Sequence, residues 1–243
     1  MEFAAFILLG AFAGGFVNGL SGFGTSMVAL AFWLYVVPPA VAVPLAVTCS
    51  LVSHLQTLPS IWHQINIKRV IPLMIGGAMG VPLGVYLLSY LTGDSFKLYL
   101  GILIVGYCAV MMMTKRQPHT IRSNSAIDAG VGFCGGILGG LSGLSGLLPT
   151  VWSNFQSWNK EAKRSVFQTY NLAIAAIALG TQATAGFITV DLVKTIGVAL
   201  PGTVAGVWLG HWVYKRLGDN RFNQAIYIIL TIAGLNLIFD ISL

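Results

Sequence analysis

The feature that most constrains this chain is a long run of residues without charge. None of residues 3–67 is Asp, Glu, Lys or Arg. A helix that crosses a bilayer needs about 20 largely apolar residues, so this run is long enough for about three crossings. Charged residues make up only 8% of the whole chain, against roughly 25% in soluble domains. The sequence therefore predicts a polytopic membrane protein.

Gly, Pro and charged residues divide the apolar sequence into ten segments. Uncharged runs of this length favour helices, whereas the strands of a membrane barrel are about ten residues long and alternate apolar with polar residues. We therefore expect an all-α protein. The segments are 3–20, 24–37, 40–58, 69–91, 95–113, 126–141, 147–158, 164–184, 193–214 and 222–240.

The basic residues predict the orientation. If each segment reverses the direction of the chain, only Lys97 and Lys194 fall on one side of the membrane. The other side receives the remaining 11 of the 13 basic residues. Because basic connections are typically cytoplasmic, both termini are predicted outside. This clustering accounts for the net charge of +6 without a nucleic-acid partner. The 11 residues are Lys68, Arg69, Lys115, Arg116, Arg122, Lys160, Lys163, Arg164, Lys215, Arg216 and Arg221.

Segments 24–37 and 147–158 are short for a full crossing. Either they span the membrane, or each forms a re-entrant hairpin with the segment before it. In the second arrangement one hairpin enters from outside and the other from inside. Both arrangements stay open, because they give every later connection the same side.

The chain contains an internal repeat. Residues 14–22 read GGFVNGLSG and residues 135–143 read GGILGGLSG, an offset of 121. Each unit holds five segments, an odd number, so the second copy enters the membrane from the opposite side. Such inverted-topology repeats are typical of secondary transporters, whose sites lie near the midplane between the copies. The predicted units are residues 1–113 and 126–243, joined by a cytoplasmic linker at 114–125.

Each unit contains a helix break rich in Gly and Ser, at residues 19–26 and 140–146. Unpaired backbone in hydrocarbon costs several kcal/mol, so such breaks persist where protein or a polar cavity covers them. The helix after each break begins with free N–H groups and the positive end of its dipole, which together favour an oxyanion. Alternatively, the glycines only allow close packing. The residues expected to bind substrate at the breaks are Ser21, Gly22, Gly24, Thr25, Ser142, Gly143, Ser145 and Gly146, and Ser26 adds a hydroxyl.

Two further segments carry polar residues that correspond across the repeat. Thr48 corresponds to Thr169, and Ser50 to Asn171, at the same offset of 121. We expect these four side chains to line the cavity beside the breaks. The alternative is ordinary hydrogen bonding between helices, worth about 0.6 kcal/mol each.

Glycine stripes also recur, with Gly76, Gly80 and Gly84 corresponding to three glycines at offset 126. The second set is Gly202, Gly206 and Gly210. These stripes favour helix packing over ligand binding. They also raise the possibility of a homodimer that packs through glycine-lined helices.

Ionisable groups are rare within the predicted spans. His54 and His211 are candidates for proton coupling, although a satisfied or interfacial histidine is the alternative. No predicted span has Asp or Glu in its interior, so a carboxylate relay for cations is not expected. No Cys, His and carboxylate cluster has metal spacing and no phosphate loop is present, so we expect neither metal nor cofactor. An anion held by helix ends, hydroxyls and amides fits better.

The two Gly-Leu-Ser-Gly breaks, at 19–22 and at 140–143 just after the basic linker, resemble those of the TauE/SafE family. These are sulfite and organosulfonate transporters, and the likeness covers essentially the whole chain. It implies a bacterial or archaeal inner-membrane permease that moves small sulfur-containing anions, often outward. The second break departs from the first, with Ser145 in place of Gly24 and Gly146 in place of Thr25.

These observations predict a multi-pass transporter that exports sulfite or organosulfonates by alternating access around a midplane oxyanion site. Its partners are then a small anion and the lipid bilayer. Two alternatives stay open. One is a passive anion channel; the other is an intramembrane enzyme that uses His54 or His211 with a nearby serine. Because no carboxylate is present to orient such a histidine, we do not expect an enzyme.

Overall fold

The computed structural model describes residues 2–114, 124–156, 158–216 and 219–239. Within these ranges the chain forms ten α-helices, two short 3-10 turns and no strand, which confirms the all-α prediction. The first half contains α1 (Glu2–Ser21), α2 (Thr25–Trp33), α3 (Pro39–Thr57), η1 (Leu58–Ser60), η2 (Trp62–Gln64), α4 (Ile67–Leu88) and α5 (Gly93–Thr114). The second half contains α6 (Ser125–Ser142), α7 (Leu147–Asn154), α8 (Lys160–Thr184), α9 (Val190–Arg216) and α10 (Asp219–Phe239).

Six of the described helices are long and apolar enough to cross a membrane, as a multi-pass protein requires. They are α1, α3 extended through η1, α4, α5, α6 and α9. Helix α8 has 25 residues, but its first turns carry charged and amide side chains. Helices α2 and α7 have nine and eight residues, too few to cross.

Helices α1 and α2 form an antiparallel hairpin. The indole Nε1 of Trp33, at the end of α2, donates a hydrogen bond to the carbonyl of Ile7 at 3.1 Å. At the other end of the hairpin, Gly14 lies against the backbone of Thr25. Helix α2 therefore returns along the second half of α1 and ends beside its first half.

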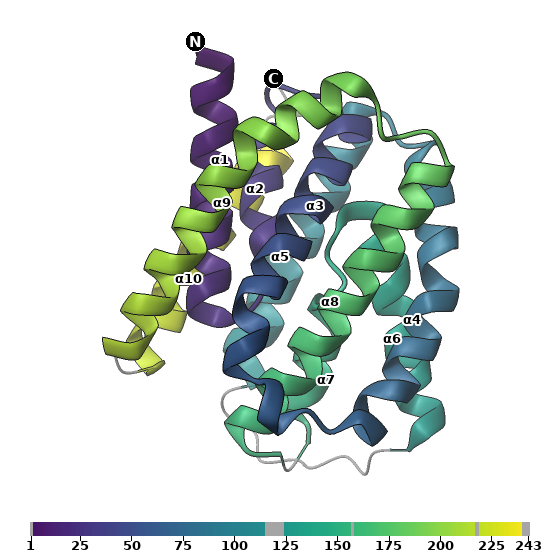
Figure 1. Ribbon diagram of the computed structural model, residues 1–243, viewed down its shortest axis with the longest axis vertical. Coiled ribbons are helices and arrows are strands. Elements are labelled where there is room, and N and C mark those ends of the chain that lie inside the picture. Colours follow the sequence, from purple (N-terminus) through teal and green to yellow (C-terminus); the bar gives the residue numbers. More distant parts are fainter. Residues whose placement is uncertain (1, 115–123, 157, 217–218, 240–243) are drawn as a thin grey trace.

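Helices α6 and α7 form a second hairpin of the same kind. Here Nε1 of Trp152 donates to the carboxylate Oδ1 of Asp128 at 2.8 Å, and Gly139 lies against Ser145. The two hairpins enter the bundle from opposite ends, because α1 begins at the top of Figure 1 and α6 at the bottom. Of the two arrangements that the sequence leaves open, the structure has the hairpins.

Both ends of the described chain lie at one end of the bundle, where α1 begins and α10 ends (Figure 1). The opposite end holds the end of α5 and the starts of α4, α6 and α8. We call it the basic end, because it carries Lys68, Arg69, Lys160, Lys163, Arg164, Lys215 and Arg216. Of the other predicted basic residues, Arg221 lies in the first turn of α10, and Lys115, Arg116 and Arg122 lie outside the described residues.

The glycine stripes are packing faces within the chain. Gly76, Gly80 and Gly84 of α4 lie so close to the backbone of α6 that a Cβ on any of them would overlap it. Gly206 and Gly210 of α9 meet α1 in the same way. Small residues let membrane helices approach to backbone contact. Because these faces are filled within one chain, they are not open to a second copy.

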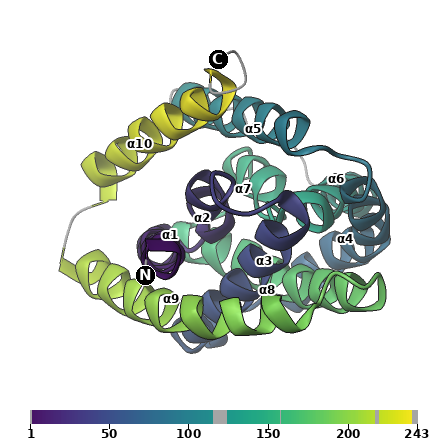
Figure 2. The same cartoon turned by 90° about the horizontal axis from the view of Figure 1, so that it is seen from above.

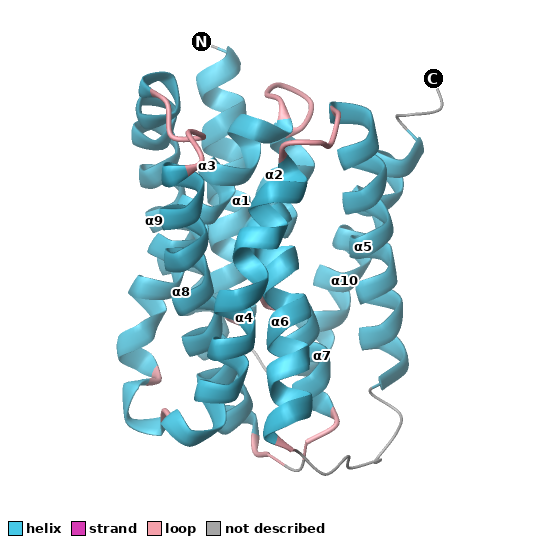
Figure 3. Cartoon of the chain, turned by 90° about the vertical axis from the view of Figure 1, so that its right-hand side faces the viewer, coloured by secondary structure: helices cyan, strands magenta, loops and turns pink. Residues whose placement is uncertain are grey.

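The remaining helices complete the bundle. From above, α1 and α9 lie side by side, as do α4 and α6, and α5 with α10 forms a separate outer wall (Figure 2). The view in Figure 3 shows the helices running roughly along one common axis. Helix α3 packs against α8 and α2, and α7 packs against α8. The tips of the two hairpins therefore lie inside the bundle, next to α3 and α8.

Candidate functional site

Each hairpin reverses at a glycine-rich break with unusual backbone geometry. Gly22 has φ 83° and Gly24 has φ 95° in the first break, and Gly143 has φ 69° in the second. Side chains with a Cβ rarely adopt these values, which explains the glycines. The serine before each break closes the preceding helix. Ser21 Oγ donates to the carbonyl of Val17 at 2.7 Å, and the hydroxyl of Ser142 makes the equivalent bond within α6.

The helix after each break begins without a side-chain cap. Gly24 is the N-cap of α2 and Gly146 the N-cap of α7, and neither offers a side-chain acceptor. The first helical bonds are those of Val28 to the carbonyl of Gly24 and of Thr150 to the carbonyl of Gly146.

In α2 the amides before Val28 have no acceptor among the described residues. In α7 the amide of Leu147 bonds to the carbonyl of Leu144 at 3.2 Å and Pro149 has no N–H, so Leu148 is the donor that its first turn leaves. The positive ends of both dipoles lie behind these donors.

The two breaks meet each other. A Cβ on Gly143 would lie 2.7 Å from Oγ of Ser26, so the first turn of α2 rests directly on the second break. On the other side, Gly146 lies against the amide group of Asn171 in α8. Helix ends that start from opposite ends of the bundle are therefore brought to one place.

A small cavity lies between the breaks. Its volume is about 20 Å³, which is room for about one water molecule. The first break, the second break, α3 and α8 all contribute to its wall. The lining residues are Phe23, Gly24, Ser26, Met27, Ser50, His54, Gly143, Leu144, Ser145, Gly146, Leu147 and Asn171.

Hydroxyl and amide groups supply the polarity of this cavity. Ser145 Oγ donates to Oδ1 of Asn171 at 3.0 Å, which leaves Nδ2 of Asn171 turned toward Gly146 as a donor. Ser26 Oγ makes only a long bond, 3.4 Å, to the carbonyl of Ala46. Both groups can therefore donate to a guest at little cost. No carboxylate is among the lining residues.

The structure brings together eight of the residues that the sequence singled out. Ser50 and Asn171, which correspond across the repeat, both line the cavity. His54 also lines it, is only 3% exposed, and its Nδ1 has no hydrogen-bond partner among the described residues. The other five are Gly24, Ser26, Gly143, Ser145 and Gly146.

Seven other predicted residues do not line the cavity. Ser142 and Thr48 use their hydroxyls on carbonyls of their own helices, and the hydroxyl of Ser21 lies 2.7 Å from the carbonyl of Val17 and 2.8 Å from that of Phe23. Thr25 and Thr169 have hydroxyl oxygens that are buried without a partner among the described residues. The last two are Gly22, which faces α8, and His211, which lies on α9 with its ring 6.5 Å from that of Tyr214.

Sequence reasoning missed the apolar part of the wall and the first turns of α8. Phe23 lies inside the first break and packs edge-on against Tyr107 and Phe167, at ring distances of 5.8 and 6.0 Å. Its place between two glycines was the available signal. Arg164, which the sequence placed at the start of a segment and counted among the basic residues of one side, lies in the second turn of α8, where its guanidinium faces Gly22. Gln168 faces the same glycine.

The arrangement offers donors for an anion but not ligands for a metal. In the described ranges, no three His, Cys, Asp or Glu side chains lie close enough to hold a metal ion. The cavity instead presents two uncapped helix N-termini, three hydroxyl groups and one amide. Helix N-termini of this kind bind oxyanions.

The family model described as sulfite exporter TauE/SafE matches residues 6–237. No curated protein and no solved structure matches the chain.

Proposed function

The chain belongs to the sulfite exporter TauE/SafE family, and from this premise we propose that it exports sulfite or small organosulfonates by alternating access around the cavity. Members of the family are transporters, so the chain is a membrane transporter and not an enzyme. The alternative of an intramembrane enzyme built on His54 or His211 is therefore wrong. The identity of the anion and the mechanism are the proposal.

One observation carries the proposal: the uncapped N-termini of α2 and α7 meet at a single polar cavity without a carboxylate. A partly buried helix end stabilises an anion by up to about 2 kcal/mol. A hydrogen bond to a charged group adds about 1.5–3 kcal/mol. Two helix ends with the hydroxyl of Ser26 and the amide of Asn171 hold a sulfo group without a covalent or metal link, while Ser145 keeps its bond to Asn171 and orients that amide.

The proposal includes an inverted repeat of five helices, and matched contacts support it. Packing of α1 on α9 corresponds to packing of α6 on α4, and α3 on α9 corresponds to α8 on α4. Trp33 is tied to residue 7 of α1, and Trp152 to residue 128 of α6, which is residue 7 moved by the repeat offset of 121. An odd number of helices in each unit places the second unit upside down relative to the first.

Alternating access follows from the two hairpins. Room for about one water is too little for a four-atom anion such as sulfite, so the structure corresponds to a closed state. A shift of the α1–α2 hairpin opens the cavity toward one end of the bundle. The same shift of the α6–α7 hairpin opens it toward the other. Each hairpin is thus a gate that carries half of the site.

Orientation follows the positive-inside rule. The basic end, with Lys68, Arg69, Lys160, Lys163, Arg164, Lys215 and Arg216, faces the cytoplasm in this proposal, and both termini lie outside. The linker at 114–125 is then cytoplasmic. The membrane is the inner membrane of a bacterial or archaeal cell, as the family implies.

Sulfite efflux from proteoliposomes tests the proposal. Purified protein should carry sulfite down its gradient, and unlabelled sulfite on the far side should accelerate exchange of labelled sulfite. Such trans-stimulation distinguishes a carrier from the alternative of a passive channel. Liposomes that carry neither sulfite nor a simple organosulfonate would refute the substrate assignment.

A further inference from the structure

We propose that the chain has a second anion site, a capture site formed by Gly22, Arg164, Gln168 and Tyr214 on the basic-end side of the cavity. Its ligand is the small sulfo-oxyanion that the transporter exports, so the inference rests on the proposed function. The site binds this anion before it reaches the cavity. It accounts for the buried polar atoms of Arg164 and Gln168, which have no hydrogen-bond partner among the described residues.

The first observation is a cation without an acceptor. Arg164 lies in the second turn of α8, and its Nε and Nη2 are buried with no hydrogen-bond partner among the described residues. The guanidinium lies over the ring of Tyr214, with Cζ 4.5 Å from the ring centre. Burying donors of a charged group without an acceptor is costly. An oxyanion, which a guanidinium can bind through two parallel hydrogen bonds, removes that cost.

The second observation is a buried amide beside Arg164 that also lacks a hydrogen-bond partner. Gln168 follows Arg164 by one helical turn and is 2% exposed, yet neither its Nε2 nor its Oε1 has a partner in the described structure. Both side chains are aimed at Gly22. A Cβ there would lie 2.6 Å from Nε2 of Gln168 and 3.3 Å from Nε of Arg164. Because a Cβ at this position would overlap the amide of Gln168, glycine allows both side chains to approach the backbone of the first break.

The third observation is the position of these groups relative to the cavity. Arg164, Gln168 and Asn171 are spaced i, i+4 and i+7 on α8 and therefore share one face of the helix. Asn171 lines the cavity, and Arg164 lies about 10 Å from it along the helix axis, toward the basic end. Phe23 follows Gly22 directly, lines the cavity and packs on Phe167. The capture site is thus next to the cavity along α8, on the side of the basic end.

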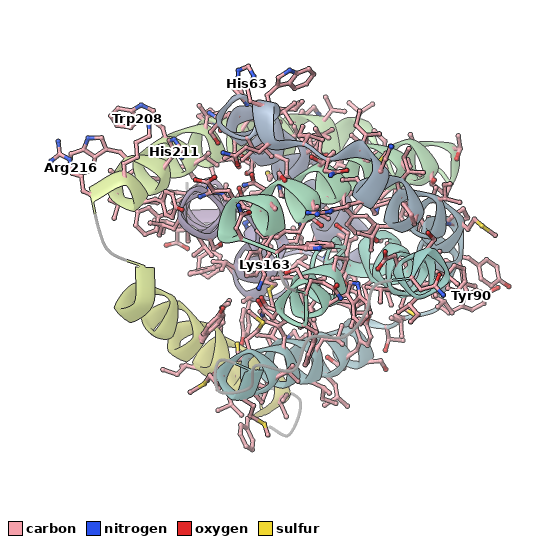
Figure 4. All side chains as sticks on the ribbon, turned by 90° about the horizontal axis from the view of Figure 1, so that it is seen from below. His63, Tyr90, Lys163, Trp208, His211 and Arg216 are labelled. Atoms are coloured by element: carbon pink, nitrogen blue, oxygen red, sulfur yellow. The ribbon has the colours of Figure 1, made fainter. Side chains whose placement is uncertain are left out.

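The charge around this place favours the arrival of an anion from the basic end. In the view of that end, Lys163 lies near the middle of the face, whereas His63 and Arg216 project from its edge (Figure 4). Positive charge in the centre of a face raises the local concentration of anions. Lys163 precedes Arg164 directly, so its positive charge attracts anions to the neighbourhood of the capture site.

The opposite break lacks the equivalent groups. At the offset of 121, Arg164 corresponds to Val43 and Gln168 to Val47, and both valines are buried. A Cβ on Gly143, the counterpart of Gly22, would lie 3.1 Å from Cγ2 of Val47. One approach to the cavity is therefore cationic and the other aliphatic. This asymmetry assigns loading of the anion to the basic end.

Calorimetric titration of the purified, full-length protein with sodium sulfite at low ionic strength tests the capture site. Two binding events per chain are expected. Arg164→Gln should weaken one of them at least tenfold, Arg164→Lys less, and Gln168→Val severalfold. The matched control Lys68→Gln removes an exposed charge from the same end and should change neither event by more than twofold.

Titrations with and without phosphatidylglycerol distinguish a lipid headgroup from the small anion. Sulfite binding that depends on Arg164 and persists with the lipid supports the proposal. If both events survive in Arg164→Gln, if Lys68→Gln weakens binding equally, or if Arg164 binds only the lipid, the capture site is refuted. The proposed function and the capture site fail in different measurements. Liposomes that show no sulfite flux would refute the proposed function, even if sulfite binding still depended on Arg164.

Discussion

Replacement of Asn171 by Leu tests the cavity with little change in shape. Asn171 is 2% exposed, its Oδ1 accepts from Ser145 at 3.0 Å, and its Nδ2 faces Gly146. Leucine is of similar size, so the packing between α7 and α8 is kept. The change removes the single amide donor from the cavity wall.

The size of the effect follows from the charge of the substrate. A hydrogen bond from Nδ2 to an anion contributes about 1.5–3 kcal/mol, and each 1.4 kcal/mol is a factor of ten. The KM for sulfite efflux should therefore rise about 10- to 100-fold. The bond to Ser145 joins neutral groups, and its loss should cost only about 0.5–1.5 kcal/mol of stability.

Sulfite efflux from proteoliposomes measures the KM, and thermal unfolding in detergent measures the stability. Thr181→Val is the matched control, because its hydroxyl lies on the same helix and bonds only to the carbonyl of Ile177, at 2.9 Å. That variant should keep the wild-type KM. A folded Asn171→Leu protein with wild-type KM would refute the placement of the anion in the cavity.

Three further predictions concern packing, the hairpins and topology. Gly80→Ala places a Cβ on the backbone of α6 and should cost about 1–3 kcal/mol of stability, seen as a lower melting temperature. Gly106→Ala is its control and should melt like the wild type, because the added Cβ would meet no atom of another described helix within 4 Å. Trp152→Phe removes the donor to Asp128 and should destabilise the protein by about 1.5–3 kcal/mol. Trp208→Phe, at a side chain 68% exposed, is its control, and equal melting of the two variants would contradict the role of the hairpin tie. A cysteine introduced at position 120 should react with an impermeant maleimide only from the cytoplasmic side, and labelling from outside would overturn the orientation.

The sequence was sufficient to predict most of the helices, because each apolar run is bounded by Gly, Pro or charge. The clearest error in a boundary is at α8, which begins at Lys160 rather than at 164. Asn159 caps this helix, its side chain accepting from the N–H of Ala162 at 2.8 Å. The charged residues among 160–163 on their own indicate a connection between helices. Because Asn159 caps the helix, they form its first turn instead. The earlier start moves Arg164 from the end of the helix into its second turn, where two of its nitrogens are buried.

The end of α2 could not be predicted from the sequence either. The segment 24–37 is apolar to its end, but α2 stops at Trp33, whose indole is held by the carbonyl of Ile7. Val37 precedes a proline, which disfavours helix at that position. The length of the segment alone did not distinguish a crossing from a hairpin, because the anchoring contact joins residues 26 positions apart in the sequence.

Within the site, the sequence predicted the places but not the directions of the side chains. Ser21 and Ser142 are the last residues of their helices, and their hydroxyls turn back to the carbonyl four residues earlier. Ser26 and Ser145 lie beyond the turn of each break and line the cavity. The glycine pattern marks where the helix breaks, whereas the backbone geometry of the break decides which hydroxyl faces the guest.

The most direct test of the account is a structure of the protein with bound selenite, a pyramidal analogue of sulfite whose selenium is located by anomalous scattering. The account predicts a selenium peak between the first turns of α2 and α7, within hydrogen-bonding distance of Ser26, Ser145 or Asn171, in a cavity wider than the closed one. A protein that binds selenite with no peak between these two helix ends would contradict it.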